Sequence, residues 1–531
     1  MNRKTLALPA VVGLLAPVLV ACGDSGGDAK GGGTIVVGTT DQLAAGKDSP
    51  APLDPAYAYD TGAWNVLRQT VQTLMHAPRG GGQPVPEAAK SCGFTDKSSE
   101  SYRCKLRSGL TFADGTPITA EDVKFSLERV QTIKADNGTA TLLSTVDTIE
   151  TKGDDEVVFH LASPDATFPY KLSTPAAGIV NKKQYDGKKL REGFQVDGSG
   201  PYTMKAESTD SKLTKVVFTR NESYTGDVKV RNKKVELRVF PDADAMGEAL
   251  EKGDIDVMTR EMSPSQIKAM EEKPKKGIEL IEMPGLSIRY LAFNTDHPSV
   301  KNKAVRQAMA AVVDRGQIAG QVYGATAQPL YSLIPANIGA HKNSFYNQYG
   351  EPSVAKAANI LEKANIKAPV ELKLHYTTDR YGAGTAREFE LLRDQLNASK
   401  LFSVTIEGAE WSSFRTAQKR GDYPVYGMGW FPDFPDPDNY VAPFLEKGNF
   451  LNSPYVSAEA RALIPQSRRQ ADRGAASKEF TQMQDIVATD VPVLPLWQGK
   501  QHVAVRSGIQ GGDTLLNASS DLQLWELSTG N

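Results

Sequence analysis

The chain has 531 residues, of which 40% are hydrophobic and 23% charged, as is ordinary for a soluble globular protein. This length is too great for a single core and predicts roughly two to four domains. The 61 basic and 63 acidic residues leave no broad basic field, which excludes nucleic acid as an expected partner. Six histidines and three cysteines also argue against a zinc or iron–sulfur centre, and no cofactor or metal is expected.

The first 22 residues have the organisation of a secretory signal. A charged start precedes the apolar run Leu6–Val20, which is interrupted by prolines and is not typical of a membrane-spanning helix. The run ends in Leu19-Val20-Ala21-Cys22, which resembles a bacterial lipobox. This resemblance implies that Cys22 is lipidated and becomes the first mature residue. An ordinary signal peptide with an incidental cysteine is the alternative. Residues 23–33, rich in Gly, Ser and Asp, suit a flexible tether.

Two further cysteines, Cys92 and Cys104, have eleven residues between them. Gly93–Ser101 is polar and typical of a turn, and Tyr102–Leu106 is typical of a strand. In an oxidising compartment the two cysteines are expected to close a hairpin-sized loop as a disulfide, and two free thiols are the alternative.

The first half of the chain combines short strands with a few helices. Thr119-Ala120-Glu121-Asp122 is a capping box with Thr119 as the N-cap, and the helix behind it places apolar residues on one face. Gly198–Tyr202 predicts a tight backbone corner. Strands are also expected at Thr34–Thr40, Glu156–Leu161, Lys215–Arg220, Val235–Phe240 and Tyr290–Thr295, and helices at Trp64–Met75 and Asp242–Lys252.

The second half alternates helices with strands. Helices are expected at Ser353–Asn365, Arg387–Ser399 and Ser412–Arg420, and strands at Val370–Tyr376, Ser403–Glu407, Val425–Trp430 and Val491–Trp497. This alternation predicts an α/β fold with a largely parallel sheet. Ligands of such sheets bind beyond the carboxyl ends of the strands, which directs attention to the residues that follow Trp430.

Those residues form the segment Gly429–Asn439, GWFPDFPDPDN. Its three prolines restrict the backbone, so the segment loses little entropy when it is held in one shape. Asp433 lies between two aromatic residues, where a carboxylate is costly unless a cation or several donors meet it. A ligand ammonium group would supply that cation. A rigid surface turn is the alternative, and for Asp436 and Asp438 we expect simple solvation. A calcium loop is excluded because its glycine and distal glutamate are missing.

Several segments together resemble solute-binding family 5 of the bacterial ABC importers, the oligopeptide- and dipeptide-binding proteins. Of these, Leu110–Arg129 and Gly429–Asn439 are the most specific. The matching segments, in the order of the family, are Leu53-Asp54-Pro55, Leu110–Arg129, Gly198–Tyr202, Tyr290–Arg315, Gly429–Asn439 and Val491–Trp497.

The resemblance implies a two-lobed, hinged α/β fold like that of periplasmic binding proteins, with an extra subdomain inserted in the first lobe. The first lobe would comprise residues 34–59, 198–295 and 498–531, the inserted subdomain residues 60–197, and the second lobe residues 296–497. The hinge would lie near Phe293–Thr295 and Leu494–Trp497.

The resemblance also implies how a ligand is held. An aspartate at the position of Asp433 receives the α-ammonium of the ligand in dipeptide-binding relatives, and a charge-assisted bond in a dry site fits that role. An arginine takes the ligand carboxylate, for which Arg380 is the first choice here and Arg387 the second. Trp430, Phe431 and Trp497 would line side-chain pockets, although burial in the core is the more common role of such residues.

The predicted function is therefore peptide capture by lobe closure and delivery to an ABC permease with its ATPase. The expected protein is a monomer, is not an enzyme, and is anchored by lipid at the extracytoplasmic face of the bacterial membrane. The alternatives are the same fold with a nickel complex, an opine or a sugar as ligand, a secreted hydrolase that uses two of the aspartates, and a structural lipoprotein.

Overall fold

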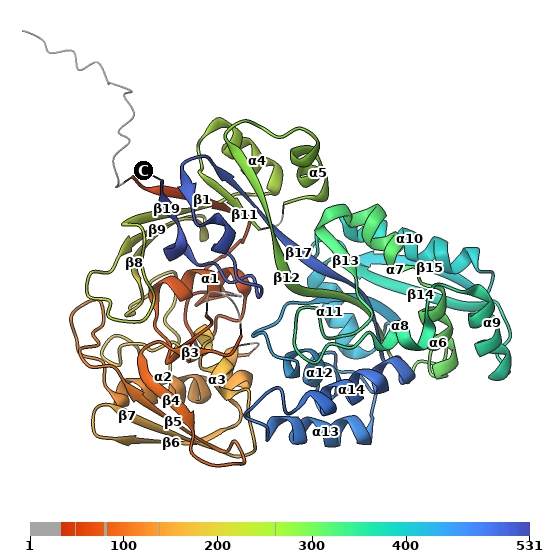
Figure 1. The fold of residues 1–531 in the computed structure, drawn as a ribbon, viewed down its shortest axis with the longest axis horizontal. Helices are drawn as coiled ribbons and strands as arrows, with labels where there is room; N and C mark the ends of the chain where they lie inside the picture. Colours follow the sequence, from red (N-terminus) through yellow and green to blue (C-terminus); the bar gives the residue numbers. More distant parts are fainter. Residues whose placement is uncertain (1–32, 48, 79–81, 137, 261, 531) are drawn as a thin grey trace, which may run out of the picture.

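The computed structural model describes residues 33–530 except 48, 79–81, 137 and 261. The predicted signal peptide, the lipidation site Cys22 and nearly all of the predicted tether lie outside the described residues. The molecule has two lobes, which are joined by two long strands (Figure 1). Across the described part of the chain, none of the helices combines the length and the hydrophobicity needed to span a bilayer.

Strands β12 (Ile278–Phe293) and β17 (Val493–Arg506) run antiparallel from one lobe to the other. They tie both lobes into one sheet of order β15-β14-β16-β12-β17-β11-β1-β10-β9-β8, with β13 also paired to β17. The register between β12 and β17 shifts between Pro284 and Ile288. The strands expected at Tyr290–Thr295 and Val491–Trp497 are thus parts of longer strands, whose other ends carry charged residues and lack a clear apolar pattern.

The first lobe contains the amino-terminal strand, the middle of the chain and the carboxyl-terminal residues. Its elements are β1 (Ile35–Thr39), β8 (Tyr202–Thr209), β9 (Lys212–Arg220), β10 (Lys234–Val239), α4 (Ala243–Lys252), β11 (Val257–Thr259), α5 (Pro264–Glu272), β18 (Ile509–Gln510) and β19 (Ser528–Thr529). Helix α1 (Thr61–Thr70), which the predicted limits assign to the inserted subdomain, shares the buried apolar cluster of these strands.

Helix α1 ends at Thr70 rather than at the predicted Met75, because the backbone corner at Gly198–Tyr202 packs against its end. The Gly200 amide donates to the Thr70 carbonyl at 2.9 Å. A Cβ at Gly198 would lie 2.2 Å from that same carbonyl oxygen, so only glycine permits this approach.

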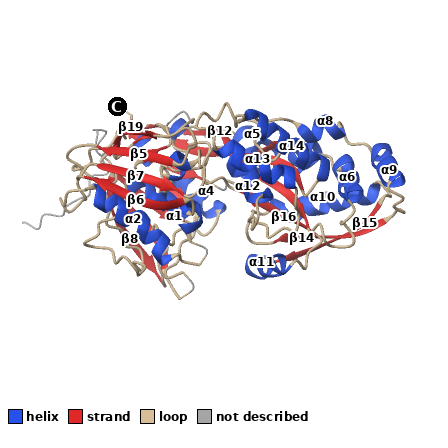
Figure 2. Cartoon of the chain, turned by 90° about the horizontal axis from the view of Figure 1, so that it is seen from below, coloured by secondary structure: helices blue, strands red, loops and turns tan. Residues whose placement is uncertain are grey.

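A four-stranded antiparallel sheet of order β4-β5-β7-β6 forms a separate layer beside the first lobe (Figures 1 and 2). The Asp122 carboxylate accepts from the Thr119 amide at 2.9 Å, as the predicted capping box requires. Cys92 and Cys104 lie opposite each other on β4 and β5 and are joined by a disulfide. The elements of this part are β2 (Met75–His76), β3 (Val85–Pro86), β4 (Ala89–Phe94), β5 (Ser101–Leu106), α2 (Ala120–Ile133), β6 (Val146–Lys152), β7 (Glu156–Leu161) and α3 (Phe168–Lys171).

The second lobe is built on β14 (Val370–Thr377), which is parallel to β15 (Phe402–Ala409) and β16 (Val425–Trp430). Helix α11 lies on one side of these strands, and α6 and α10 lie on the other (Figure 2). The remaining elements are α6 (Lys303–Val312), α7 (Arg315–Ile318), β13 (Ala327–Pro329), α8 (Ser344–Tyr349), α9 (Val354–Lys363), α10 (Gly384–Ala398), α11 (Trp411–Arg420), α12 (Asp438–Leu445), α13 (Ala458–Arg468) and α14 (Ser477–Asp490).

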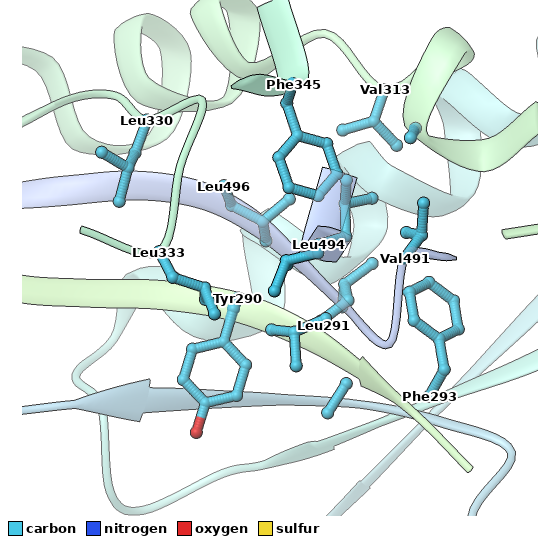
Figure 3. Close-up of a cluster of buried hydrophobic side chains, with 14 of the residues drawn as sticks. Tyr290, Leu291, Phe293, Val313, Leu330, Leu333, Phe345, Val491, Leu494 and Leu496 are labelled. Atoms are coloured by element: carbon cyan, nitrogen blue, oxygen red, sulfur yellow. The ribbon is translucent and has the colours of Figure 1, made fainter. Parts of the chain in front are cut away.

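Each part of the molecule has its own core. The largest cluster of buried apolar residues runs from Leu286 to Trp497 and joins the second lobe to the ends of the crossing strands β12 and β17. In this cluster Leu291, Leu494 and Leu496 of the crossing strands lie among side chains from the loops and helices above them, whereas Tyr290 points to the opposite side of β12 (Figure 3). The predicted two-lobed α/β fold is confirmed.

Candidate ligand-binding site

The segment Gly429–Asn439 forms a closed loop between β16 and α12. Asn439, in the first turn of α12, fixes this loop with its side chain. Its Oδ1 accepts from the Asp433 amide at 2.9 Å and from Trp430 Nε1 at 3.3 Å, and its Nδ2 donates to the Asp433 carboxylate at 3.1 Å. The Tyr440 hydroxyl of α12 donates to the Leu286 carbonyl at 2.9 Å, which ties the loop to the crossing strand β12.

The loop lies where the two lobes meet. Tyr59 of the first lobe donates its hydroxyl to Asp433 Oδ2 at 3.1 Å. The rings of Tyr170 and Phe434 stack at 5.7 Å, and the Ala166 amide donates to the Arg468 carbonyl at 2.8 Å. A group bound at Asp433 therefore has parts of both lobes within reach.

Asp433 is half-buried and accepts hydrogen bonds, but no cation of the described residues pairs with it. Tyr59 and Asn439 donate to its carboxylate, and among the described residues it forms no ion pair. Burial raises the pKa of Asp433 to about 6, and the two hydrogen bonds and the positive charge of Lys171 only partly oppose that rise. The site thus holds a desolvated carboxylate to which a ligand cation would bind favourably.

Asp436 and Asp438 are not solvated, so the expectation for these two residues is wrong. Asp436 accepts from Arg473 Nε at 2.7 Å and Nη2 at 2.9 Å, and Asp438 accepts from Arg468 Nε and Nη2, both at 3.0 Å. Both carboxylates are buried. The arginines come from α13 and the loop after it, which fold over this part of the segment and exclude water from it.

The three predicted aromatic residues lie at different depths. Trp430 is buried against Phe444 and Phe450, with ring centroids 5.8 and 5.1 Å away. Phe431 is half-buried beyond the end of β16. Trp497 is buried on β17 and donates Nε1 to Glu388 at 2.9 Å. Trp430 therefore packs in the core, while Phe431 and Trp497 both lie against a third residue, Arg289.

The two predicted arginines lie on the exposed surface of the second lobe. Arg380 follows β14, and its guanidinium carbon is 5.5 Å from the centre of the Trp411 ring. Arg387 on α10 pairs with Glu390 at 3.0 Å. Arg387 already has a counter-ion on its own helix, whereas Arg380 is accessible beside an aromatic ring.

Arg289 was missed by the sequence analysis. It lies on β12 directly opposite Gly429, and its guanidinium carbon is 4.3 Å from the Tyr381 ring centre and 5.1 Å from those of Phe431 and Trp497. The only signal in the sequence is one arginine within the apolar strand stretch Leu286–Phe293. Its neighbours come from distant segments, so the pattern along the chain does not predict this arrangement.

Residues 83–452 match the model of the bacterial extracellular solute-binding proteins, family 5, middle region. The chain belongs to this family. A family 5 relative, the probable D,D-dipeptide-binding periplasmic protein DdpA of Escherichia coli, is 26% identical over 89% of this chain and 91% of its own. Members of family 5 are extracellular solute-binding proteins, as the family description states.

Solved structures share the fold at low sequence identity. DppA of Helicobacter pylori, in complex with the peptide STSA, has a TM-score of 0.76 at 22% identity and covers 94% of this chain and 99% of its own. AgaA of A. tumefaciens, in complex with agropinic acid, has a TM-score of 0.73 at 22% identity and covers 93% of this chain and 96% of its own.

Proposed function

We propose that this protein captures peptides between its two lobes and delivers them to an ABC permease. The observation that carries this proposal is Asp433, a half-buried carboxylate at the meeting point of the lobes that accepts hydrogen bonds but has no ion-pair partner among the described residues. The ammonium group of a peptide is the ligand group that such a carboxylate favours, because the resulting bond is charge-assisted and shielded from water. The names of relatives such as DdpA, which is described as dipeptide-binding, point to the same class of ligand.

The ligand would lie along the carboxyl end of β16. Asp433 would hold the ammonium group, while the half-buried Phe431 would present apolar surface to the ligand and Trp430 would keep Asn439 in place from the core. Trp497 is buried and would support Arg289 from behind. The role predicted for Arg380 at the ligand carboxylate stays a prediction; its guanidinium is exposed beside the Trp411 ring. Closure would then be driven by contacts made only when the lobes are together, such as that between Tyr59 and Asp433.

The lobes would move about the two crossing strands. The predicted hinge at Phe293–Thr295 and Leu494–Trp497 remains a prediction, as do the domain limits at residues 60, 198, 296 and 498. The register shift between Pro284 and Ile288 is a second place where β12 and β17 would bend, because the regular ladder of hydrogen bonds is interrupted there.

A non-peptide solute is the second candidate, because AgaA, which shares the fold, was solved with agropinic acid. Native mass spectrometry of the chain from Gly23, purified from cells, separates the two. None of the contacts described above involves residues before 33, so this chain retains them all. Denaturation should release a peptide or a family of peptides. An empty protein that ignores peptide pools but binds an opine, a metal chelate or a sugar would contradict peptide capture, and turnover of added peptide would indicate a hydrolase.

We also propose that Cys22 anchors the protein to the outer face of the membrane through lipid. The support is the lipobox-like Leu19-Val20-Ala21-Cys22 and the polar stretch that follows it. In cells that express Cys22→Ala, the protein should move from the membrane fraction to the soluble fraction. Retention of the variant in the membrane fraction would rule out this anchor.

A further inference from the structure

Arg289 occupies an aromatic cage on the second lobe, next to the segment that carries Asp433. The rings of Tyr381, Phe431 and Trp497 have their centres 4.3–5.1 Å from the guanidinium carbon. Contacts of this kind favour the cation and hold the side chain in place. They leave the N–H donors at the edge of the guanidinium available to an acceptor.

The cage depends on a glycine. Gly429 pairs with Arg289 across β12 and β16, and a Cβ at Gly429 would lie 2.1 Å from Arg289 Nη1. Any larger residue would displace the guanidinium from the strand surface. The segment that carries Asp433 thus begins with the residue that makes room for Arg289.

The donors of Arg289 are largely unused. Its recorded hydrogen bond runs from Nη1 to the carbonyl of the preceding residue, Ile288, at 3.3 Å, and its Nε is buried without a partner. Arg289 forms no ion pair with any residue that the structure describes. A half-buried cation without a counter-ion carries an unfavourable desolvation free energy. The unpaired carboxylate of Asp433 carries the same kind of cost with the opposite charge.

Glu388, a carboxylate on which the charge of Arg289 acts, is engaged elsewhere. Its Oε2 accepts from the Tyr323 hydroxyl at 2.5 Å and from Trp497 Nε1 at 2.9 Å, and no ion pair links it to Arg289. Burial raises the pKa of Glu388 despite these bonds and the charge of Arg289. Glu388 therefore orients Trp497, one wall of the cage, and leaves the guanidinium open to a ligand.

We propose that Arg289 binds the carboxylate of the ligand and that the ligand is a short peptide with a free carboxyl terminus. This inference rests on the proposed peptide capture and on the role of Asp433. A guanidinium held flat between rings presents its edge to a carboxylate and binds it in bidentate fashion. Arg289 supplies this edge beside Gly429, four residues before Asp433, whereas Arg380 lies outside the cage.

The chain sets an upper limit on ligand length. The guanidinium lies against Gly429, and Asp433 is four residues further on. Four residues span at most about 14 Å, to which the aspartate side chain adds a few ångströms. For a ligand that lies between the two groups, the two charge-assisted contacts take up about 2.8 Å each, which leaves roughly 12 Å at most between its charged ends. An extended peptide advances about 3.3 Å per residue, so a peptide of about four residues or fewer fits.

The test compares two pools of tripeptides of the same composition, one with free carboxyl termini and one with carboxyl-terminal amides. Binding of each pool to the chain from Gly23 is measured by calorimetry for the wild type, Arg289→Gln, Arg289→Lys and Arg380→Gln. The matched control is Arg420→Gln, a surface arginine paired with Asp422. Melting temperatures without ligand show whether each variant is folded.

The wild type should prefer the free acids by about tenfold or more, and Arg289→Gln should bind both pools alike. Arg289→Lys should retain part of the preference because it keeps the charge but loses the planar fork. A preference that survives in Arg289→Gln, or that disappears only in Arg380→Gln, would overturn the assignment. Equal binding of both pools by the wild type would also overturn it while leaving peptide capture intact. If neither pool binds the wild type, peptide capture fails and this inference fails with it.

Discussion

Asp433 and Asp436 are three residues apart in one loop, yet their charges are compensated in opposite ways. Asp436 is buried and receives two hydrogen bonds from Arg473, at 2.7 and 2.9 Å. Asp433 receives one bond from Tyr59 and one from Asn439, neither of them charged. Asp436, on the α13 side of the loop, is paired with an arginine of the protein, whereas Asp433, which contacts the first lobe, has no ion-pair partner among the described residues.

The arginines differ in the same way. Arg473 uses its remaining donors on the carbonyls of Ser467 and Gln470, at 2.7 and 3.1 Å. Arg289 has neither a counter-ion nor a partner for its Nε among the described residues. Asp436 and Arg473 thus satisfy each other within the chain. Asp433 and Arg289 form no ion pair with any described residue, so a ligand could complete them.

Breaking the buried ion pair between Arg473 and Asp436 should have the largest effect, a loss of stability. Arg473→Met leaves the Asp436 carboxylate buried without its counter-ion. The free energy of unfolding should fall by about 3–5 kcal/mol, as is usual when one partner of a buried ion pair is removed. Chemical denaturation followed by circular dichroism measures the change. The neighbouring Arg469, whose side chain is exposed, provides the control Arg469→Met, which should change stability little. A loss below about 1 kcal/mol in Arg473→Met would show that the pair is not structural.

Removing the charge of Asp433 should weaken peptide binding and should not lower the stability of the fold. Asp433→Asn keeps the shape of the side chain but removes its charge. Peptide affinity should fall by about 2–3 kcal/mol, or roughly 30- to 150-fold, because the ligand ammonium loses its counter-ion. The unfolding free energy at neutral pH should stay the same or rise, because a poorly compensated buried charge is gone. Calorimetry with the peptide released from the wild type measures the affinity.

Asp422→Asn serves as the control for this variant, because Asp422 is an exposed carboxylate of the same lobe that pairs with Arg420 at 2.6 Å. Equal peptide affinity in Asp433→Asn and the wild type would remove Asp433 from the site. A large loss of stability in Asp433→Asn would instead place Asp433 with Asp436, among the structural charges.

The pH dependence of binding should separate the two aspartates further. Burial raises the pKa of Asp433 from its ordinary 3.8 to about 6. The ionised carboxylate and the charged ligand ammonium are both needed, so affinity should be highest between about pH 6 and 7.5 and fall below pH 6 by up to about tenfold per unit. At about pH 8 it should fall again, because the α-ammonium of the peptide loses its proton there. The free energy of unfolding should instead decrease as the pH rises. The folded protein binds more protons than the unfolded chain between these two pKa values, so the contribution of Asp433 is lost as the pH rises through about 6.

Titration of peptide affinity between pH 4.5 and 8, roughly spanning this pKa, tests both statements when it is combined with melting temperatures over the same range. Asp433→Asn should lack both dependences. A wild-type affinity that does not change below pH 6 would mean that the carboxylate is not the anchor or that its pKa is not raised.

The sequence predicts Asp433 as a ligand-binding residue, but it does not predict which charged residues pair inside the protein. Asp433 was found because an acid between aromatic residues and prolines is unusual within a few residues of sequence. The partners of Asp436 and Asp438 are 37 and 30 residues away, on elements that fold over the loop only in the finished structure. Arg289 precedes Gly429 by 140 residues and meets it only through strand pairing. Local patterns indicate the fold class and the loop, whereas the pairing of charges depends on tertiary contacts.

The smallest expected effect comes from Tyr59, the first-lobe residue that donates to Asp433 at 3.1 Å. This hydrogen bond stabilises the ionised carboxylate, so Tyr59→Phe should raise the pKa of Asp433 further. Loss of one hydrogen bond of about 1 kcal/mol corresponds to a shift of about 0.7 pH units in the midpoint of peptide binding. Calorimetry across the same pH range measures that midpoint.

Tyr346→Phe is the matched control, because the Tyr346 hydroxyl also donates to a carboxylate, that of Glu351 at 2.9 Å, but does so on the exposed surface of the second lobe. Its binding midpoint should equal that of the wild type. If Tyr59→Phe likewise leaves the midpoint in place, the first lobe does not stabilise the charge on Asp433, and the contact between the lobes at this point serves closure alone. An upward shift in Tyr59→Phe only would tie the ionisation of the ligand anchor to the approach of the two lobes.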